Sequence, residues 1–247
     1  MRIVSLNTWK CEHHYKQRLA LISEQVKLLK PDIVLLQEVF RSDLGHDTAA
    51  CIAEALSLDY YYTPARNKQR IVENNLVVSE SGLCLLSKFN IIDKGYFVLP
   101  SDNNDGDRCA QWILISQHQR LIAVINTHLT HLSQRENLRK KQIAKILNSV
   151  EQLPMHDVLL LGGDMNAQLK DTSLRFLLDQ GWKSNWQQPY SCSNTLNIGE
   201  ERCIDHLFLS PASNAIWSTS STALKSPSSG GLFPSDHMAI YTTLDLG

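Results

Sequence analysis

The pattern of apolar and polar positions predicts strands and helices in alternation at the start of the 247-residue chain. Apolar, β-branched runs at 2–6 and 32–37 have the length of buried strands. Between them, apolar residues at helical spacing predict a helix over 15–30, which Pro31 ends. This strand–helix–strand order is typical of an α/β fold.

The rest of the chain predicts mainly strands, which we expect to be mostly antiparallel because turn residues separate them. The predicted strands are 59–63, 75–79, 83–87, 91–99, 109–116, 120–127, 157–162, 203–209, 213–219 and 238–245. The predicted helices are 46–58, 134–150 and 173–180. Ser133 and Glu136 fit a capping box at the start of the long helix. The expected fold is one α/β sandwich domain over 1–247, with two mostly antiparallel sheets packed face to face and flanking helices.

Composition mainly argues against certain classes of protein and site. No apolar stretch approaches the roughly 20 residues of a membrane helix, and the segment MRIVSLNTW is too short for a signal peptide. We therefore expect a cytoplasmic protein with no transmembrane segment. The six cysteines form no C-x-x-C pair, which argues against structural zinc and favours free thiols. A net charge of −1 gives no strong attraction to bulk nucleic acid.

Polar side chains interrupt the apolar runs from one end of the chain to the other. Carboxylates, amides and imidazoles are avoided in a core unless they are paired. Their repetition therefore predicts a shared polar cleft at one edge of the sheets. The residues are Asn7, Glu38, His128, Asp164, Asn166, Asp205, Asp236 and His237.

Glu38 is the strongest candidate for a metal ligand. It follows DIVLLQ directly, so we expect it at the exit of a buried strand. With Asp236 and the amide of Asn7 it would form an oxygen-rich set that suits Mg²⁺ or Mn²⁺. The alternative is an ordinary surface glutamate after a strand.

The sequence GGDMN suggests a site for handling water. Asp164 and Asn166 project to the same side of an extended chain. The carboxylate can hold or deprotonate a water, and the amide can orient it or hold a phosphate oxygen. A turn stabilised by the aspartate side chain is the alternative.

Two histidines complete the candidate chemistry. His237 can donate to a phosphate oxygen and stabilise charge that builds in a transition state. Asp205 is an awkward charge in the apolar run CIDHLFLS, so we pair it provisionally with His237. His128 ends an apolar run, where a lone histidine is more often structural.

The ordered set of motifs resembles the endonuclease/exonuclease/phosphatase superfamily. The segments that carry the resemblance are SLNTW, QEV, SGLCLLSKFNI, NTHL, GGDMNA, CIDHLFLS and SDHMAI, in the order of the family. The resemblance implies a four-layer α/β sandwich and Mg²⁺-dependent (or Mn²⁺-dependent) hydrolysis of a phosphate ester by direct attack of water.

The resemblance also implies a role for each residue. Glu38 would bind the metal, with Asn7 and Asp236 close to it. Asp164 would activate water, and Asn166 would contact the phosphate. His237 would pair with Asp205 and bind the phosphate, and His128 would assist the phosphate or the leaving group. Looser alignments make Arg108 a phosphate contact and Glu73 the carboxylate partner of His128.

The substrate class stays open between several phosphate esters. The SGLCLLSKFNI segment looks most like sphingomyelinase-type and small bacterial members, which makes a phosphodiester in a phospholipid head group one candidate. However, the sequence has no membrane span or long apolar insertion that would favour a substrate in a bilayer. Two basic clusters and three aromatic residues that could stack bases favour a nuclease. They are Arg66, Lys68 and Arg70; Arg135, Arg139, Lys140, Lys141 and Lys145; and Trp182, Trp186 and Tyr190. For these residues, the alternatives are a solvated surface for the basic ones and loop packing for the aromatic ones, and we favour loop packing. The alternatives are a phosphomonoesterase acting on inositol phosphates or other small phosphates, and a catalytically silent binding module. No obligate protein partner is evident.

Overall fold

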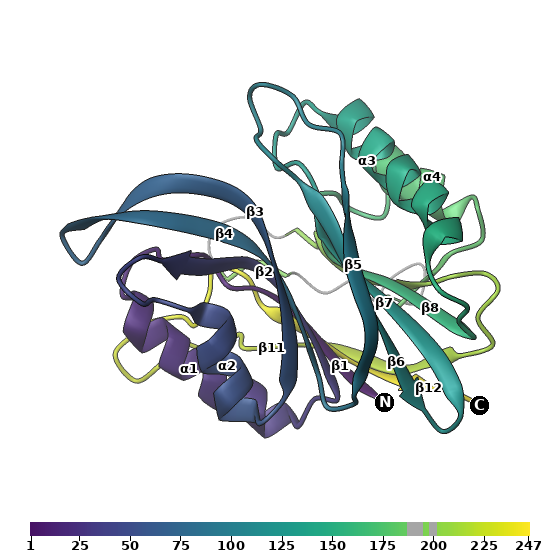
Figure 1. Cartoon of the computed structure of the whole chain (residues 1–247), viewed down its shortest axis with the longest axis horizontal. Helices are drawn as coiled ribbons and strands as arrows, with labels where there is room; N and C mark the ends of the chain where they lie inside the picture. The colour runs from purple at the N-terminus through teal and green to yellow at the C-terminus, as the bar shows by residue number, and fades with distance from the viewer. Residues whose placement is uncertain (187–194, 198–201) are drawn as a thin grey trace.

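Two six-stranded β-sheets pack face to face, and helices cover their outer faces (Figure 1). The structure is a computed structural model, and it describes all residues except 187–194 and 198–201. The strand order is β11-β12-β1-β2-β4-β3 in the first sheet and β5-β6-β7-β8-β10-β9 in the second. The expected sandwich of mostly antiparallel sheets is confirmed.

The first sheet comprises β1 (Arg2–Asn7), β2 (Ile33–Ser42), β3 (Asp59–Val72), β4 (Asn75–Ser87), β11 (Ile216–Ala223) and β12 (Ala239–Asp245). The second comprises β5 (Ile91–Val98), β6 (Cys109–Gln117), β7 (Arg120–His128), β8 (Val158–Asp164), β9 (Lys183–Ser184) and β10 (Asp205–Leu209). The helices are α1 (Tyr15–Leu29), α2 (Thr48–Leu56), α3 (Glu136–Ser149), the short 3₁₀ helix η1 (Val150–Gln152) and α4 (Thr172–Leu178). No helix of the described residues is long and apolar enough to cross a membrane.

The core forms three apolar layers, one between the sheets and one under each helix pair. Leu35 and Leu160 lie in the layer between the sheets. Ile22 of α1 and Ile52 of α2 pack on the first sheet, and Ile143 of α3 packs on the second. Central strands are therefore apolar on both faces, which explains their continuous apolar runs.

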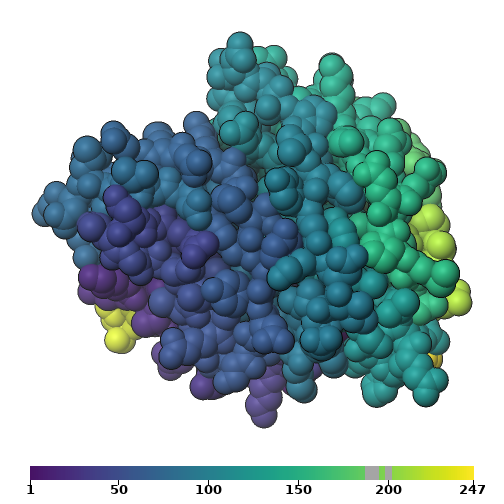
Figure 2. Space-filling view, viewed as in Figure 1, coloured from purple at the N-terminus to yellow at the C-terminus, as the bar shows by residue number. Residues whose placement is uncertain are grey.

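Strand β3 extends beyond the predicted range 59–63, and the predicted strands 75–79 and 83–87 form one continuous strand, β4, so that β3 and β4 together make a two-stranded ribbon. The ladder continues from Asp59↔Ser87 to Val72↔Asn75, and the ribbon projects past the sheet in Figure 1 and forms the left edge of the molecule in Figure 2. No apolar run marks the β3 part of this ribbon, residues 64–72, because many of its side chains are exposed and polar.

The predicted capping box is wrong. Helix α3 has Arg135 at its N-cap with no side-chain hydrogen bond. The Glu136 carboxylate instead accepts from Arg139 Nε at 2.7 Å and from the backbone N–H of Ser173 at 3.0 Å. It thus ties α3 to α4 rather than closing the first turn of its own helix.

The sheet topology brings chemically active strand ends to one edge. Strand β1 runs parallel to β2, with Asn7 opposite Gln37, and β7 runs parallel to β8, with His128 opposite Asp164. Parallel strands end at the same edge of a sheet. The antiparallel strand β10 begins there, with Asp205 opposite Asp164.

Candidate active site

One cleft between the two sheets collects the polar strand ends. It has a volume of about 250 Å³, and among the residues that line it are Asn7, Glu38, Arg108, His128, Asp164, Asn166, Asp236 and His237. Asp205 does not line the cleft, but it contacts the ring of His237, which does. The polar positions that the sequence analysis selected are thus brought together.

A β-bulge directs Glu38 into the cleft. Strand β2 continues to Ser42, so the expectation that Glu38 follows the end of its strand is wrong. The register against β4 shifts between Leu36 and Val39, and Glu38 has a φ of 55°. A bulge turns a side chain out of the regular alternation, and here Glu38 meets Lys10 Nζ at 2.7 Å.

Asp164 is the central acceptor of the site. Its Oδ2 atom accepts from Asn7 Nδ2 at 3.0 Å, lies 3.4 Å from His128 Nε2 and lies 3.8 Å from His237 Nε2. Its Oδ1 atom accepts the backbone N–H of Asn166 at 2.9 Å. Burial and the neighbouring Asp205 raise the pKa of Asp164 to about 7. This carboxyl group can therefore exchange a proton near neutral pH.

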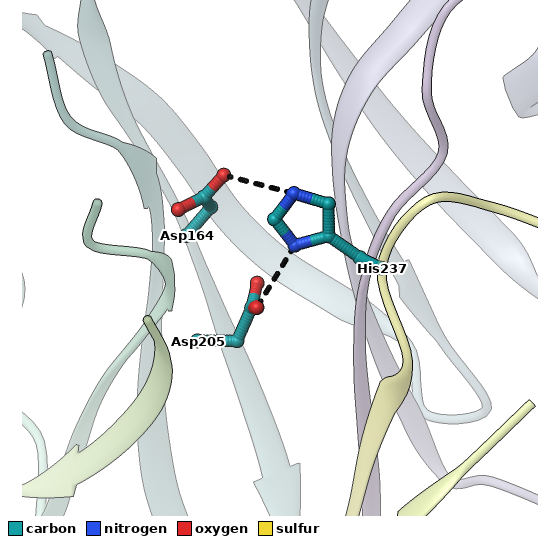
Figure 3. A group of neighbouring side chains, drawn as sticks. All are labelled: Asp164, Asp205 and His237. Atoms are coloured by element: carbon teal, nitrogen blue, oxygen red, sulfur yellow. Dashed lines mark hydrogen bonds and ion pairs between the residues drawn. The ribbon is translucent and has the colours of Figure 1, made fainter. Parts of the chain in front are cut away.

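His237 lies between two aspartates (Figure 3). Its Nδ1 atom is 2.9 Å from Asp205 Oδ2, and its Nε2 atom faces Asp164. Burial opposes protonation, but Asp205, Asp164 and Asp236 outweigh it and raise the pKa of His237 to about 10. The imidazolium ion is therefore the form expected at neutral pH, with both ring nitrogens as donors.

The raised pKa of His237 predicts a specific loss of stability in alkaline solution. Its ordinary value is 6.5, so protonation stabilises the fold fully below that pH and the contribution disappears as the pH rises to about 10. The free energy of unfolding of the natural chain, relative to His237→Gln, should fall by about 1–2 kcal/mol between pH 7 and 9. Urea unfolding at each pH measures this. The exposed His14→Gln variant should follow the natural chain, and parallel pH profiles for the natural chain and His237→Gln would contradict the assignment.

In the second sheet, β8 with Asp164 lies between β7, which ends at His128, and β10, which begins at Asp205. Asn166 lies on the β7 side, where it contacts Leu129. Burial, reinforced by the positive charge of Arg108, holds the pKa of His128 well below its usual range, so the ring is neutral. Asn166 has a φ of 48° and donates through its side-chain amide to the carbonyl of Leu129. This contact fixes the turn that follows β8.

Arg108 lines the cleft, whereas Glu73 does not approach His128. Arg108 is held by Asp105, at 2.7 Å from Nη2, and also reaches the carbonyl of His128. Glu73 lies in the turn between β3 and β4 and pairs with Lys16 at 2.8 Å. The alignment of Glu73 as the partner of His128 is therefore wrong; the carboxylate recorded near that ring is Asp164.

Arg18 was missed by the sequence analysis although it supports the site. It is 1% exposed, and its guanidinium donates to the carbonyls of Thr8, Trp9, Lys10, Glu12 and Pro234. It joins the loop after β1 to the loop before Asp236. An arginine within an amphipathic helix has the sequence signature of a surface residue, so no local pattern identifies it.

Burial excludes base stacking by two tryptophans, and a disulfide contradicts the expectation that all the cysteines are free. Trp182 and Trp186 are 7% and 2% exposed and pack in the core, so they are not free to stack on bases; Tyr190 lies outside the described residues. Cys203 is disulfide-bonded, against the expectation of free thiols. Cys11, Cys51, Cys84 and Cys109 are free.

Comparison with known proteins agrees with this geometry. The model of the Endonuclease/Exonuclease/phosphatase family matches residues 4–237, whereas the curated proteins contain no significant match. An endonuclease/exonuclease/phosphatase from Bacteroides vulgatus shares 16% identity over 100% of this chain and 98% of its own, with a TM-score of 0.79.

Two further solved structures show the same fold. A humanized Danio rerio (D. rerio) TDP2 has 17% identity and a TM-score of 0.75, over 99% of this chain and 98% of its own. A mannosyl-6-phosphatase from Bacteroides thetaiotaomicron has 20% identity and a TM-score of 0.75, over 99% of both chains. Because the family model covers almost the whole chain and includes every strand end at the cleft, the chain belongs to the endonuclease/exonuclease/phosphatase family.

Proposed function

We propose that the protein is a divalent-metal-dependent phosphoric ester hydrolase that cleaves a phosphodiester by direct attack of water. The observation that carries the proposal is the convergence on one oxygen atom. Asp164 Oδ2 faces the amide of Asn7, the ring of His128 and the ring of His237. A carboxylate with these neighbours can accept a proton from a water in the cleft, while the histidines contact the phosphate.

His237 is the proposed electrostatic partner of the phosphate. Asp205 binds Nδ1 and keeps the imidazole charged and oriented, so that Nε2–H faces Asp164. His237 also lines the cleft. A fixed positive donor stabilises negative charge that develops on phosphoryl oxygens. His128 is neutral and can donate or accept, which suits contact with the leaving group or with a phosphate oxygen. Asn166 and Arg108 line the same cleft and would bind the remaining oxygens.

The metal would be held by Glu38 and Asp236, with Asn7 beside them. Glu38 and Asp236 both line the cleft. Burial and the charge of Glu38 raise the pKa of Asp236, although His237 opposes this. Such a pair suits a hard cation, which takes oxygen ligands and keeps several waters. When bound, the cation would neutralise charge on the phosphate. The Oδ1 atom of Asn7 accepts the backbone N–H of Trp9 at 3.0 Å. Because an amide oxygen has two lone pairs, this atom could also contact the metal.

A second group of possible metal ligands is Asp164, Asp205 and His237, whose ligand atoms lie within 4.8 Å of one another. We favour the oxygen-only set because these three side chains are buried, Asp205 is already hydrogen-bonded to His237, and Asp164 lies 3.8 Å from the same ring. Mg²⁺ needs room for its waters. The trio is therefore assigned to proton transfer and charge stabilisation.

Phosphomonoester hydrolysis is the second candidate function. One similar structure is a mannosyl-6-phosphatase, and a cleft of about 250 Å³ is small enough for a sugar phosphate. A silent binding module is disfavoured because all the residues that the mechanism needs are present and close together.

Metal-dependent hydrolysis of bis-p-nitrophenyl phosphate tests the proposal. We expect turnover with Mg²⁺ or Mn²⁺, loss of turnover with EDTA, and slower hydrolysis of p-nitrophenyl phosphate. The reverse preference would favour the phosphomonoesterase. Parallel assays on plasmid DNA, RNA, sphingomyelin and inositol phosphates identify the substrate class. A folded protein that hydrolyses none of these with either metal would contradict the proposal.

A further inference from the structure

The cleft contains cationic side chains that differ in how far they are neutralised. Lys10 meets Glu38 at 2.7 Å, and Arg108 meets Asp105 at 2.7 Å. Arg66 also lines the cleft, but within the described part of the chain no acidic side chain is recorded within ion-pair distance of it. Its guanidinium is therefore available to an anion that enters the cleft.

A β-bulge in β3 directs Arg66 to the cleft. Thr63 pairs with Leu83 and Arg66 pairs with Ser81, with a register shift between Pro64 and Arg66. The extra residue places Arg66 on the same face as Thr63, at a spacing of three instead of the usual two. That face is turned to the second sheet, because Gln111 of β6 donates to Thr63 Oγ1 at 2.9 Å.

The opposite wall leaves room for the guanidinium. Gly106, in the loop between β5 and β6, has a φ of 94°, and a Cβ atom there would lie 3.2 Å from Arg66 Cζ. A larger residue at this position would require the guanidinium to shift by a few tenths of an ångström and would also be strained, because only glycine adopts this φ readily. The exposed Arg66 side chain therefore reaches from β3 to the loop between β5 and β6, and it forms no ion pair with the residues that the structure describes.

We propose that Arg66 forms a second anion subsite, which binds a phosphate group of the substrate other than the one that is cleaved. This rests on the proposed function, because the cleaved phosphate is assigned to the wall with His128, Asp164 and His237. A planar guanidinium binds phosphate through two parallel hydrogen bonds. The substrate class is thus a phosphate ester that carries an additional phosphate close to the reacting one.

Calorimetric titration with a matched ligand pair tests the subsite without any need for turnover. The probes are propyl phosphate and 1,3-propanediol bisphosphate, with the ethanediol and butanediol bisphosphates to vary the spacing, in excess Mg²⁺. We expect the natural chain to bind its best bisphosphate about tenfold more tightly than propyl phosphate, which corresponds to about 1.4 kcal/mol. Arg66→Met should remove this preference, and Arg66→Lys should keep part of it.

Lys68→Met is the matched control. Lys68 lies two residues further along the same strand and is exposed, but it does not line the cleft. This variant should keep the preference for bisphosphate. Gly106→Ala should weaken the preference in the same direction as Arg66→Met but by less, because its Cβ shifts the guanidinium only slightly and its φ strains the loop.

Two outcomes would overturn the subsite: no preference at any spacing in the natural chain, or equal preferences in Arg66→Met and the natural chain. Neither outcome affects hydrolysis of bis-p-nitrophenyl phosphate, which carries a single phosphate. Failure of that hydrolysis, with the bisphosphate preference intact, would reject the proposed function and leave the subsite standing.

Discussion

Glu38→Gln should lower turnover of a phosphodiester by a factor of about 10² or more and raise the metal concentration needed for half-maximal activity about tenfold. The substitution keeps the size of the side chain and removes a negative charge from the oxygen-rich set with Asp236. Titration of activity with Mg²⁺ and Mn²⁺, together with direct metal binding by calorimetry, measures both effects.

The fold should tolerate this change. Glutamine has the shape that the bulged position requires, and the lost partner is Lys10, whose side chain is 31% exposed. Loss of such a partly exposed ion pair costs at most about 1 kcal/mol. The matched control is Glu73→Gln, which removes an exposed carboxylate paired with Lys16. It should leave activity and metal binding unchanged. An unaltered metal requirement in folded Glu38→Gln would move the metal site elsewhere, with Asp164, Asp205 and His237 as the next candidates.

Asp205→Asn should lower kcat by a factor of about 10²–10³ while leaving the metal requirement unchanged. The residue does not line the cleft, so it acts through its neighbours: it holds His237 at 2.9 Å and contributes to the raised pKa of Asp164. We expect the effect on His237 to dominate. Without the carboxylate, the pKa of His237 should fall from about 10, so that the ring becomes neutral in the assay. The phosphate then loses a positive donor.

The pH profile distinguishes this effect from general damage to the site. If charge on His237 is what is lost, the activity of Asp205→Asn relative to the natural chain should rise as the pH is lowered from 8 to 6. A structural defect would lower activity by a constant factor at all pH values. Glu38→Gln and Asp205→Asn also control for each other, because only the first should alter metal binding. Tighter or weaker metal binding in Asp205→Asn would contradict the separation of the two groups.

The strands and the polar residues at their ends were accessible from the sequence because both are local signals. Runs such as DIVLLQEV and DVLLLGGD identify buried strands and the carboxylates that interrupt them. The topology then brings these interruptions to one edge of the sheets, so the grouping in one cleft agrees with the sequence analysis. The roles of the individual residues remain predictions.

The ends of a strand were harder to predict from the sequence where backbone pairing with a neighbouring strand, and not an apolar run, maintains the strand. Strands β3 and β4 continue as a ribbon through exposed polar positions, held by the ladder between them. Strand β2 continues through Glu38 because its bulge keeps it paired with β4 on both sides. A ladder of backbone hydrogen bonds has no signature in the side chains of a single sequence.

By itself, the sequence determined the α/β sandwich, the family resemblance and the set of polar positions, because strand length, periodicity and motif order are properties of short segments. The tertiary structure decided which partners these residues have. Asn7 meets Asp164 across 157 positions of sequence, Arg18 joins two distant loops, and Glu73 pairs with Lys16 instead of His128. The reason is physical: hydrogen bonds and charge interactions depend on separations of a few ångströms, which are fixed only when the sheets pack against each other.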